Sequence, residues 1–294
     1  MPEADASNLG TKPSSAESRG QGWEIVDSQR LRDPATAAVI RTLMSECGDL
    51  QLLHDPVWLA GSSDVGSLGN AIDPGIAFLL HREGRLIGYA PFTRGTRTLR
   101  FGIGELTLHR RRLPSLTLVD DIILAAVSEA ERADLICELF RTLAGRLQTR
   151  QALFLEGIPT ESVLLTTASR LGGSGWVAIP LGQSYEHHFA DLPPSFSEYE
   201  RQMGRRSQKS LRYSQRKLSE HLGGAVRARR FASREDVPEF VASAQAISRK
   251  TYQWKLLGLG LRDTASLTVR LTLAAEHDWM RCYILYCGEE AVAF

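Results

Sequence analysis

The chain has 294 residues, a formal net charge of +1, 43% apolar residues and 23% charged residues, which is the composition of a soluble globular protein with room for two domains. No apolar run reaches membrane-spanning length, and the N-terminus lacks the basic lead and apolar core of a secretory signal, which excludes both kinds of segment. We therefore expect a cytoplasmic protein. Residues 1–22, rich in Ser, Gly, Ala and acids, are predicted to form a disordered tail.

The cysteines give no sign of a metal site. None of them forms a CxxC pair or has a histidine at zinc spacing. Cys282 and Cys287 lie in a strand-like run, where burial is the simpler interpretation. We predict no bound metal.

The first half of the chain alternates strands and helices. A strand begins at Trp23, and the segment Gly75–Phe92 reads as two strands around a Glu83-Gly84 turn. The other predicted elements are helices at about 33–47, 56–60, 129–147 and 160–171, and strands at about 98–106, 152–158 and 176–181. The arginine-rich segment His109–Pro114 reads as a solvated loop.

The second half begins with the same pattern. A strand is predicted at 225–231, and a helix follows with Asp236 as its cap and Glu239 at capping-box spacing. A second helix is predicted at about 265–276, and the chain then continues as strand, Gly288 turn and strand. Both halves therefore have the order strand, helix, helix, hairpin, with about 53 residues from first strand to hairpin in one and about 55 in the other.

This repeat defines the predicted fold. We expect an α/β (α+β) chain with two domains, 23–182 and 183–294, each a mixed sheet flanked by helices. After its hairpin the first half continues for about 90 residues, whereas the second half stops at Phe294. Because a hairpin without more of its sheet buries too little surface, we expect the second domain to be truncated or completed by another chain.

A cluster of positive charge marks the segment GRRSQKSLRYSQRKL (204–218), which holds six Lys or Arg and no acid. A helix is predicted to start at Ser195, to break or kink at Gly204 and to continue to Gly223. On a helical wheel one stripe contains the cations Arg205, Lys209, Arg212 and Arg216, and the opposite side contains Leu211, Leu218 and Leu222. One interpretation is a solvated face paired with acids elsewhere. The other is an anion site for the phosphates of a nucleotide-bearing donor, for an acidic acceptor or for RNA.

Two further segments are candidates for binding. The end of a helix and the loop after it combine aromatic and cationic side chains that can line a substrate pocket, namely Lys250, Tyr252, Trp254 and Arg262. Core packing of the two aromatic residues is the alternative. The segment RLGGSG (170–175) has the spacing of a pyrophosphate loop, but it lies between a helix and a strand instead of before a helix, so we interpret it as a helix cap.

The segment from Tyr185 to Phe294 resembles the acetyltransferase domain of the CelD-type family, which belongs to the GNAT superfamily and is related to the Fem-type peptidoglycan transferases. The resemblance lies in the Leu-Pro-Pro-Ser-Phe lead at 192–196, the arginine-rich helix, the Val-Pro-Glu-Phe helix start at 237–240 and the terminal hairpin. The first half is similar only in its order of elements, as in a tandem GNAT-like arrangement.

The resemblance implies an acyltransferase that uses acetyl-CoA as its donor. It would move the acyl group to an amine or hydroxyl of a small-molecule or saccharide acceptor, in polysaccharide or envelope biosynthesis. In the superfamily the pyrophosphate loop and the tyrosine acid follow the hairpin that closes this sequence, so no catalytic residue is assigned.

Two alternatives stay open. One is a non-catalytic module that binds an anionic polymer, RNA or polysaccharide, through the basic helix. The other is a Fem-type transferase that uses aminoacyl-tRNA, in which case the stripe would face the RNA.

Overall fold

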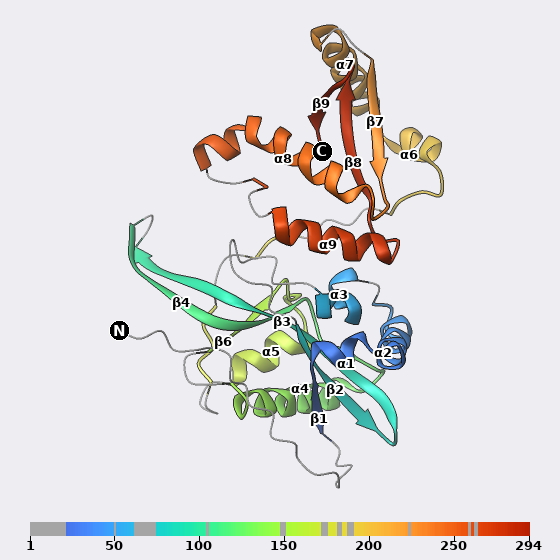
Figure 1. Cartoon of the computed structure of the whole chain (residues 1–294). Helices are drawn as coiled ribbons and strands as arrows, with labels where there is room; N and C mark the ends of the chain where they lie inside the picture. Colours follow the sequence, from blue (N-terminus) through green and yellow to red (C-terminus); the bar gives the residue numbers. More distant parts are fainter. Residues whose placement is uncertain are drawn as a thin grey trace.

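The computed structural model describes residues 22–49, 51–61, 75–103, 106–147, 151–171, 176–180, 184–186, 191–222, 225–257, 260–261 and 264–294. These residues form a mixed α/β structure with one sheet of six strands and one of three, each flanked by helices (Figure 1). Among the helices in these ranges, none combines the length and apolar character needed to cross a membrane.

The six-stranded sheet is built from the first half of the chain. Its strands are β1 (Trp23–Val26), β2 (Ile76–Arg82), β3 (Arg85–Ile103), β4 (Leu106–Val119), β5 (Ile123–Leu124) and β6 (Ala152–Glu156). They follow the order β1-β2-β3-β4-β6, with β5 paired to β3. Only the β4–β6 pair is parallel, so the sheet is mixed.

Helices cover both faces of this sheet. They are α1 (Ser28–Arg32), α2 (Pro34–Glu46), the 3-10 helix η1 (Leu52–His54), α3 (Pro56–Gly61), α4 (Glu129–Ala144) and α5 (Val163–Arg170). Because side chains alternate along a strand, Phe78 and Leu80 of β2 join one core cluster with Ile136 of α4. Their neighbours Ala77 and Leu79 join a second cluster with residues of α2 and α3 on the opposite face. The middle of this sheet is therefore enclosed on both sides.

The three-stranded sheet is built from the second half. Its strands are β7 (Val226–Phe231), β8 (Cys282–Cys287) and β9 (Glu290–Ala293), all antiparallel. The accompanying helices are α6 (Phe196–Gln202), α7 (Arg205–Leu222), α8 (Val237–Lys250), the π-helical turn η2 (Gln253–Leu257) and α9 (Thr264–Glu276). One face packs against α8 and α9, where Phe231 and Ile284 are fully buried. On the opposite face Tyr283 is 51% exposed.

The predicted repeat of elements is confirmed. The order β1-β2-β3 in the first sheet matches β7-β8-β9 in the second, and in both the first strand pairs antiparallel with the first strand of the hairpin. Both hairpin turns use left-handed backbone, with φ of 52° at Glu83, 80° at Gly84 and 59° at Gly288. The helices between strand and hairpin also occur near their predicted positions.

In the first half, the strand predicted at 98–106 is confirmed as far as Ile103, whereas the loop predicted at His109–Pro114 and the strand predicted at 176–181 are wrong. The strand at 98–106 and the loop His109–Pro114 are parts of one long hairpin, because β3 runs on to Ile103 and β4 begins at Leu106. Residues 176–180 form no strand apart from a single bridge at Trp176. Trp176 instead packs edge-on against Phe140 of α4, with 5.8 Å between ring centroids, and the side chain of Val177 is exposed.

The predicted cap of α8 is also wrong in its chemistry. The Asp236 carboxylate accepts hydrogen bonds from the backbone N–H groups of Ala232 and Ser233, both at 3.0 Å, and closes the loop before the helix. Glu239 pairs with Arg229 of β7 instead of reaching back to the cap. The acids of this segment thus tie β7 to the start of α8.

The two halves of the chain, each with its own sheet, meet where α3 lies against α9 and the residues just after it. The indole of Trp58 in α3 lies edge-on to that of Trp279, with centroids 6.3 Å apart. A side chain at Gly61 would collide with Leu273 of α9, since its Cβ would lie 2.5 Å from a leucine methyl carbon. Figure 1 shows α3 directly beside α9.

Candidate functional site

The basic helix α7 begins where α6 is interrupted. Met203 has extended backbone and Gly204 separates the two helices, as the sequence predicted. The side-chain amide of Gln208 donates to the carbonyl oxygens of Glu200 at 2.5 Å and Met203 at 2.9 Å. These bonds fix the break, because they satisfy carbonyl groups that a continuous helix would have used.

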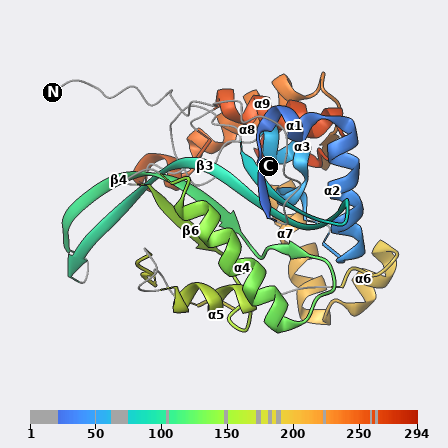
Figure 2. The same cartoon turned by 90° about the horizontal axis from the view of Figure 1, so that it is seen from below.

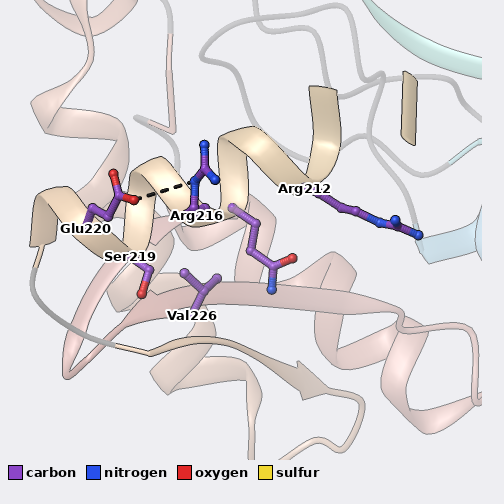
Figure 3. A pocket seen from close by; sticks show the side chains of 6 residues that line it. Arg212, Arg216, Ser219, Glu220 and Val226 are labelled. Atoms are coloured by element: carbon purple, nitrogen blue, oxygen red, sulfur yellow. Dashed lines mark ion pairs between the residues drawn. The ribbon is translucent and has the colours of Figure 1, made fainter. Parts of the chain in front are cut away.

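The four stripe cations all lie on the exposed side of α7. Within the described part of the chain, no acid pairs with Arg205 or Lys209. Arg216 makes an ion pair with Glu220, its Nε 3.5 Å from Oε1 (Figure 3). Arg212 and Arg216 border a hollow of about 370 Å³. Its complete lining is Arg212, Gln215, Arg216, Ser219, Glu220 and Val226.

The apolar side of α7 is only partly covered. Leu218 is half-buried near the sheet, where the thiol of Cys287 in β8 donates to its carbonyl oxygen at 3.7 Å. Leu211, in the N-terminal half of the helix, is 56% exposed. The side chain of Leu222 lies outside the described residues. The helix therefore contacts the sheet through its C-terminal half. Only in that half does the predicted arrangement apply, with leucine packed toward the sheet and cations on the opposite, exposed side.

Three of the cations that flank the stripe are paired with acids. Arg234 contacts Glu276 of α9 at 2.7 Å, and Arg227 contacts Glu289 at 3.4 Å. Lys217 contacts Glu220 at 3.0 Å. These residues fit the interpretation of a solvated surface balanced by acids elsewhere in the fold, whereas Arg205 and Lys209 do not.

The side chains predicted to line a pocket at the end of α8 have separate surroundings in the structure. Lys250 makes an ion pair with Glu290 of β9 at 2.9 Å, and Tyr252 is 62% exposed. Trp254 packs over Gly260, and the Arg249 guanidinium lies 5.8 Å from its ring centroid. Arg262 lies outside the described residues. Neither of the two hollows described for this structure is lined by these side chains, so their role in substrate binding stays a prediction.

A larger cavity of about 500 Å³ lies where the two halves of the chain meet, and no motif in the sequence predicts it. Its lining is Arg41, Met44, Asp49, Gln51, Leu52, Asp55, Asp278, Trp279 and Arg281. These residues come from two segments more than 200 positions apart in the chain, so only the folded structure brings them together.

The charges around this cavity are neutralised in pairs. Arg41 donates from Nε and Nη2 to the two oxygens of Asp55, at 2.7 and 3.1 Å, and this hydrogen bonding raises the pKa of Arg41. Asp55 also accepts from the backbone N–H of Val57 at 2.9 Å and so caps α3. Arg281 pairs with Asp278 at 3.1 Å. Each of these ion pairs lies within one half of the chain, so the paired charges line the cavity from both sides.

His54, behind this wall, is 2% exposed and has both ring nitrogens engaged. Nδ1 lies 2.6 Å from a carboxylate oxygen of Asp49, and Nε2 lies 2.9 Å from the carbonyl oxygen of Val119. Both partners are acceptors, so these surroundings favour the imidazolium form, in which both nitrogens donate. Burial alone lowers the pKa of His54, but the bonds to Asp49 and Val119 outweigh it and raise the pKa above 6.5.

The partners of His54 are held in turn. Burial raises the pKa of Asp49, but the hydrogen bonds from His54 and the Gln51 N–H outweigh burial and lower it below 3.8. The hydroxyl of Tyr89 donates to the backbone carbonyl of His54 at 2.9 Å, and burial raises the pKa of Tyr89 well above 10.0. Because both ring nitrogens are engaged with acceptors inside the protein, we interpret His54 as a structural clamp and not as a base for a substrate.

Among the residues that the structure describes, no group of three or more His, Cys, Asp or Glu side chains is arranged to hold a metal ion.

The comparisons with known proteins add little. No family model matches the chain, and no curated protein matches it. Among solved structures, the chain is similar to an aminoglycoside acetyltransferase from an uncultured soil metagenomic sample, determined in complex with sisomicin. The match has 11% sequence identity and a TM-score of 0.31, and it covers 58% of this chain and 95% of that one. A likeness at this level carries no argument about function.

Proposed function

We propose that the chain is an acyltransferase built from two GNAT-like domains, residues 23–182 and 183–294. It moves an acyl group, in particular acetyl, from coenzyme A to an amine or hydroxyl of a small-molecule or saccharide acceptor. The observation that carries this proposal is the repeat of one strand plan, in which a strand, two or more helices and a hairpin give the same strand order in both sheets. The second copy is also the part of the chain that resembles CelD-type acetyltransferases.

The reaction requires a firmly held donor. The acceptor nitrogen or oxygen attacks the thioester carbonyl carbon and gives up its proton, the C–S bond breaks, and the departing thiolate takes up a proton. Coenzyme A carries several phosphate charges far from the thioester. The protein can bind the donor through these phosphates without blocking the reacting carbon.

The cations of α7 suit this task. Arg212 and Arg216 border the hollow beside β7 and can each present a planar fork of donors to a phosphate. Arg205 and Lys209 continue the same stripe without an acid partner among the described residues. We propose that these four side chains hold the donor phosphates.

The acceptor is proposed to contact the end of α8 and the segment that follows it. Lys250, Tyr252, Trp254 and Arg262 come from this segment, and the ring of Tyr252 is open to solvent. An aromatic face beside cationic groups suits a hydroxylated or sugar acceptor.

The test is acetyl-CoA-dependent transfer by the whole chain to a panel of amine and sugar acceptors, followed as release of the coenzyme A thiol. The double variant Arg212→Gln, Arg216→Gln is expected to raise the KM for acetyl-CoA about tenfold or more with little change in kcat, since lost phosphate contacts weaken substrate and transition state alike. A matched control removes two paired cations elsewhere, Arg234→Gln with Arg281→Gln, and is expected to leave KM unchanged. Absence of both thiol release and acetyl-CoA binding would overturn the proposal.

One observation favours a second candidate. Arg205, Arg206 and Lys209 are exposed and have no acid partner in the described ranges, which also suits a non-catalytic module that binds an anionic polymer, or a Fem-type transferase facing aminoacyl-tRNA. Salt-sensitive RNA binding without any affinity for coenzyme A would favour these alternatives.

A further inference from the structure

The hairpin of β3 and β4 extends beyond the sheet as a two-stranded arm, which we define as Thr96–Ile103 and Leu106–Pro114. β6 pairs with β4 only over Ser115–Val119, so the sheet ends where the arm begins. Figures 1 and 2 both show the arm reaching away from the helices of the first half. At about 3.4 Å per residue the arm is roughly 27 Å long.

Positive charge is concentrated on this arm. The sequence from Arg94 to Pro114 contains six arginines, and its one acid is Glu105. The register places Arg100 directly opposite Arg110, and Arg112 follows on the same face opposite Thr98. The other face carries Arg111 opposite Leu99.

These charges are costly for an isolated hairpin. Like charges at directly opposed positions repel, and a two-stranded ribbon has little buried surface to offset them. Arg97, at the base of the arm, pairs with Glu156 at 2.9 Å. Further out, Arg100, Arg110 and Arg111 have no acid partner among the residues that the structure covers. Arg100, Arg110 and Arg111 thus present their guanidinium groups to solvent with no acid beside them among the described residues.

We propose that this arm binds double-stranded nucleic acid through its phosphate backbone. A two-stranded ribbon fits the major groove of B-form DNA, which is about 12 Å wide, and a 27 Å arm spans most of one helical turn of about 34 Å. From within the groove, arginines on both faces reach the flanking phosphates. Each guanidinium can bind a phosphate through two parallel hydrogen bonds.

The side chains between the arginines favour a ligand-binding arm over an arm that is merely solvated. Phe101 is 47% exposed and Leu108 is 63% exposed, although an arm kept soluble by charge alone has no need of exposed apolar groups. The ring of Phe101 lies 6.1 Å from that of His109, and this tilted pair lies beside the guanidinium groups near the tip. Such apolar groups contact base edges and methyl groups in a groove. This inference stands apart from the proposed acyl transfer, which uses α7.

The test is fluorescence anisotropy of a labelled 20-base-pair DNA duplex titrated with the whole chain at about 50 and about 200 mM salt, with an RNA duplex of the same sequence in parallel. The arm variant is Arg100→Gln, Arg110→Gln, Arg111→Gln. The matched control removes three unpaired cations from α7, Arg205→Gln, Arg206→Gln, Lys209→Gln. Melting curves of both variants confirm folding, and the arm variant should melt no lower than the unaltered chain because its repulsions are relieved.

We expect the arm variant to weaken duplex binding about tenfold or more at the lower salt concentration. It should also reduce the slope of log K against log salt by about 2 to 3, since each lost phosphate contact removes about 0.9. Tighter binding of DNA than of the RNA duplex, whose major groove is deep and narrow, supports entry into the groove. Failure of the unaltered chain to bind either duplex overturns the proposal, and so does a loss of affinity in the α7 variant that equals or exceeds the loss in the arm variant.

Discussion

The two sheets of this chain share a strand order and differ in how far they are enclosed. In the first, Phe78 and Phe92 are fully buried, and helices close both faces. In the second, Phe231 and Ile284 are as deeply buried on the face under α8 and α9, whereas Tyr283 on the other face is half exposed. The same plan therefore gives a two-sided core in one half and a one-sided core in the other.

The two halves also differ in where cations without an acid partner lie among the described residues. In the first half they lie away from the enclosed sheet, at Arg100, Arg110 and Arg111 of the β3–β4 arm. The one-sided sheet has them close by, on α7, which covers only part of its open face. The comparison can be tested by removing side chains from each kind of surface.

The largest effect is expected in the enclosed sheet. Phe78→Ala should lower the free energy of unfolding by about 3–5 kcal/mol, because it removes a fully buried ring and leaves a cavity beside Phe92. Urea unfolding measures the change. A loss below about 1 kcal/mol would show that this sheet is not enclosed on both faces.

A pair of substitutions separates the two faces of the second sheet. Phe231→Ala, on the face under α8, should destabilise by about 3 kcal/mol or more. Tyr283→Ala, on the open face, should cost under about 1 kcal/mol. Equal costs in thermal or urea unfolding would contradict a one-sided core.

The His54–Asp49 clamp predicts how stability depends on pH. Because folding raises the pKa of His54, its contribution is fully present below about 6.5 and is lost as pH rises through the folded pKa. Folding lowers the pKa of Asp49, so its contribution is present above about 3.8 and is lost as pH falls through the folded pKa. His54→Gln should therefore cost about 1–3 kcal/mol at about pH 6 and less at about pH 9.

The control for this clamp is His221→Gln at an exposed position of α7. It should leave the free energy of unfolding unchanged at both pH values. A His54→Gln penalty that is the same at both would mean that the ring is not an imidazolium in the folded chain.

The smallest effect is expected at the surface. Arg234→Gln breaks an ion pair with Glu276 in which both side chains are well exposed, so the free energy of unfolding should change by under about 0.5 kcal/mol. A loss of several kcal/mol in urea unfolding would show that this contact is needed to hold α9 to the loop between β7 and α8.

Much of the fold could be predicted because its signals are local. The Glu83-Gly84 and Gly288 turns, the apolar runs of β2 and β8 and the apolar periodicity of α8 are each visible within a few residues. These elements predicted the repeat of strands and helices. The helix break was predicted from Gly204 itself.

The failures have non-local causes. The second strand of the arm is predicted as a loop because a ribbon exposed on both faces lacks the alternation of apolar and polar residues that identifies a half-buried strand. Asp236 was misassigned because its carboxylate had two sets of N–H groups within reach and bonded to those before the helix. The cavity is lined by segments as far apart in sequence as Asp55 and Trp279, and no local pattern encodes that these segments come together.

Hydrogen exchange of the backbone amides, resolved strand by strand in the whole chain, tests the shared plan most directly. The middle strands β2 and β8 are hydrogen-bonded on both sides in their triplets, so both should be protected, with β2 the slower because its two faces are enclosed. The result that would contradict the account is rapid exchange throughout β8, at the rate of the segments between helices, because β7, β8 and β9 would then not form a sheet that repeats β1, β2 and β3.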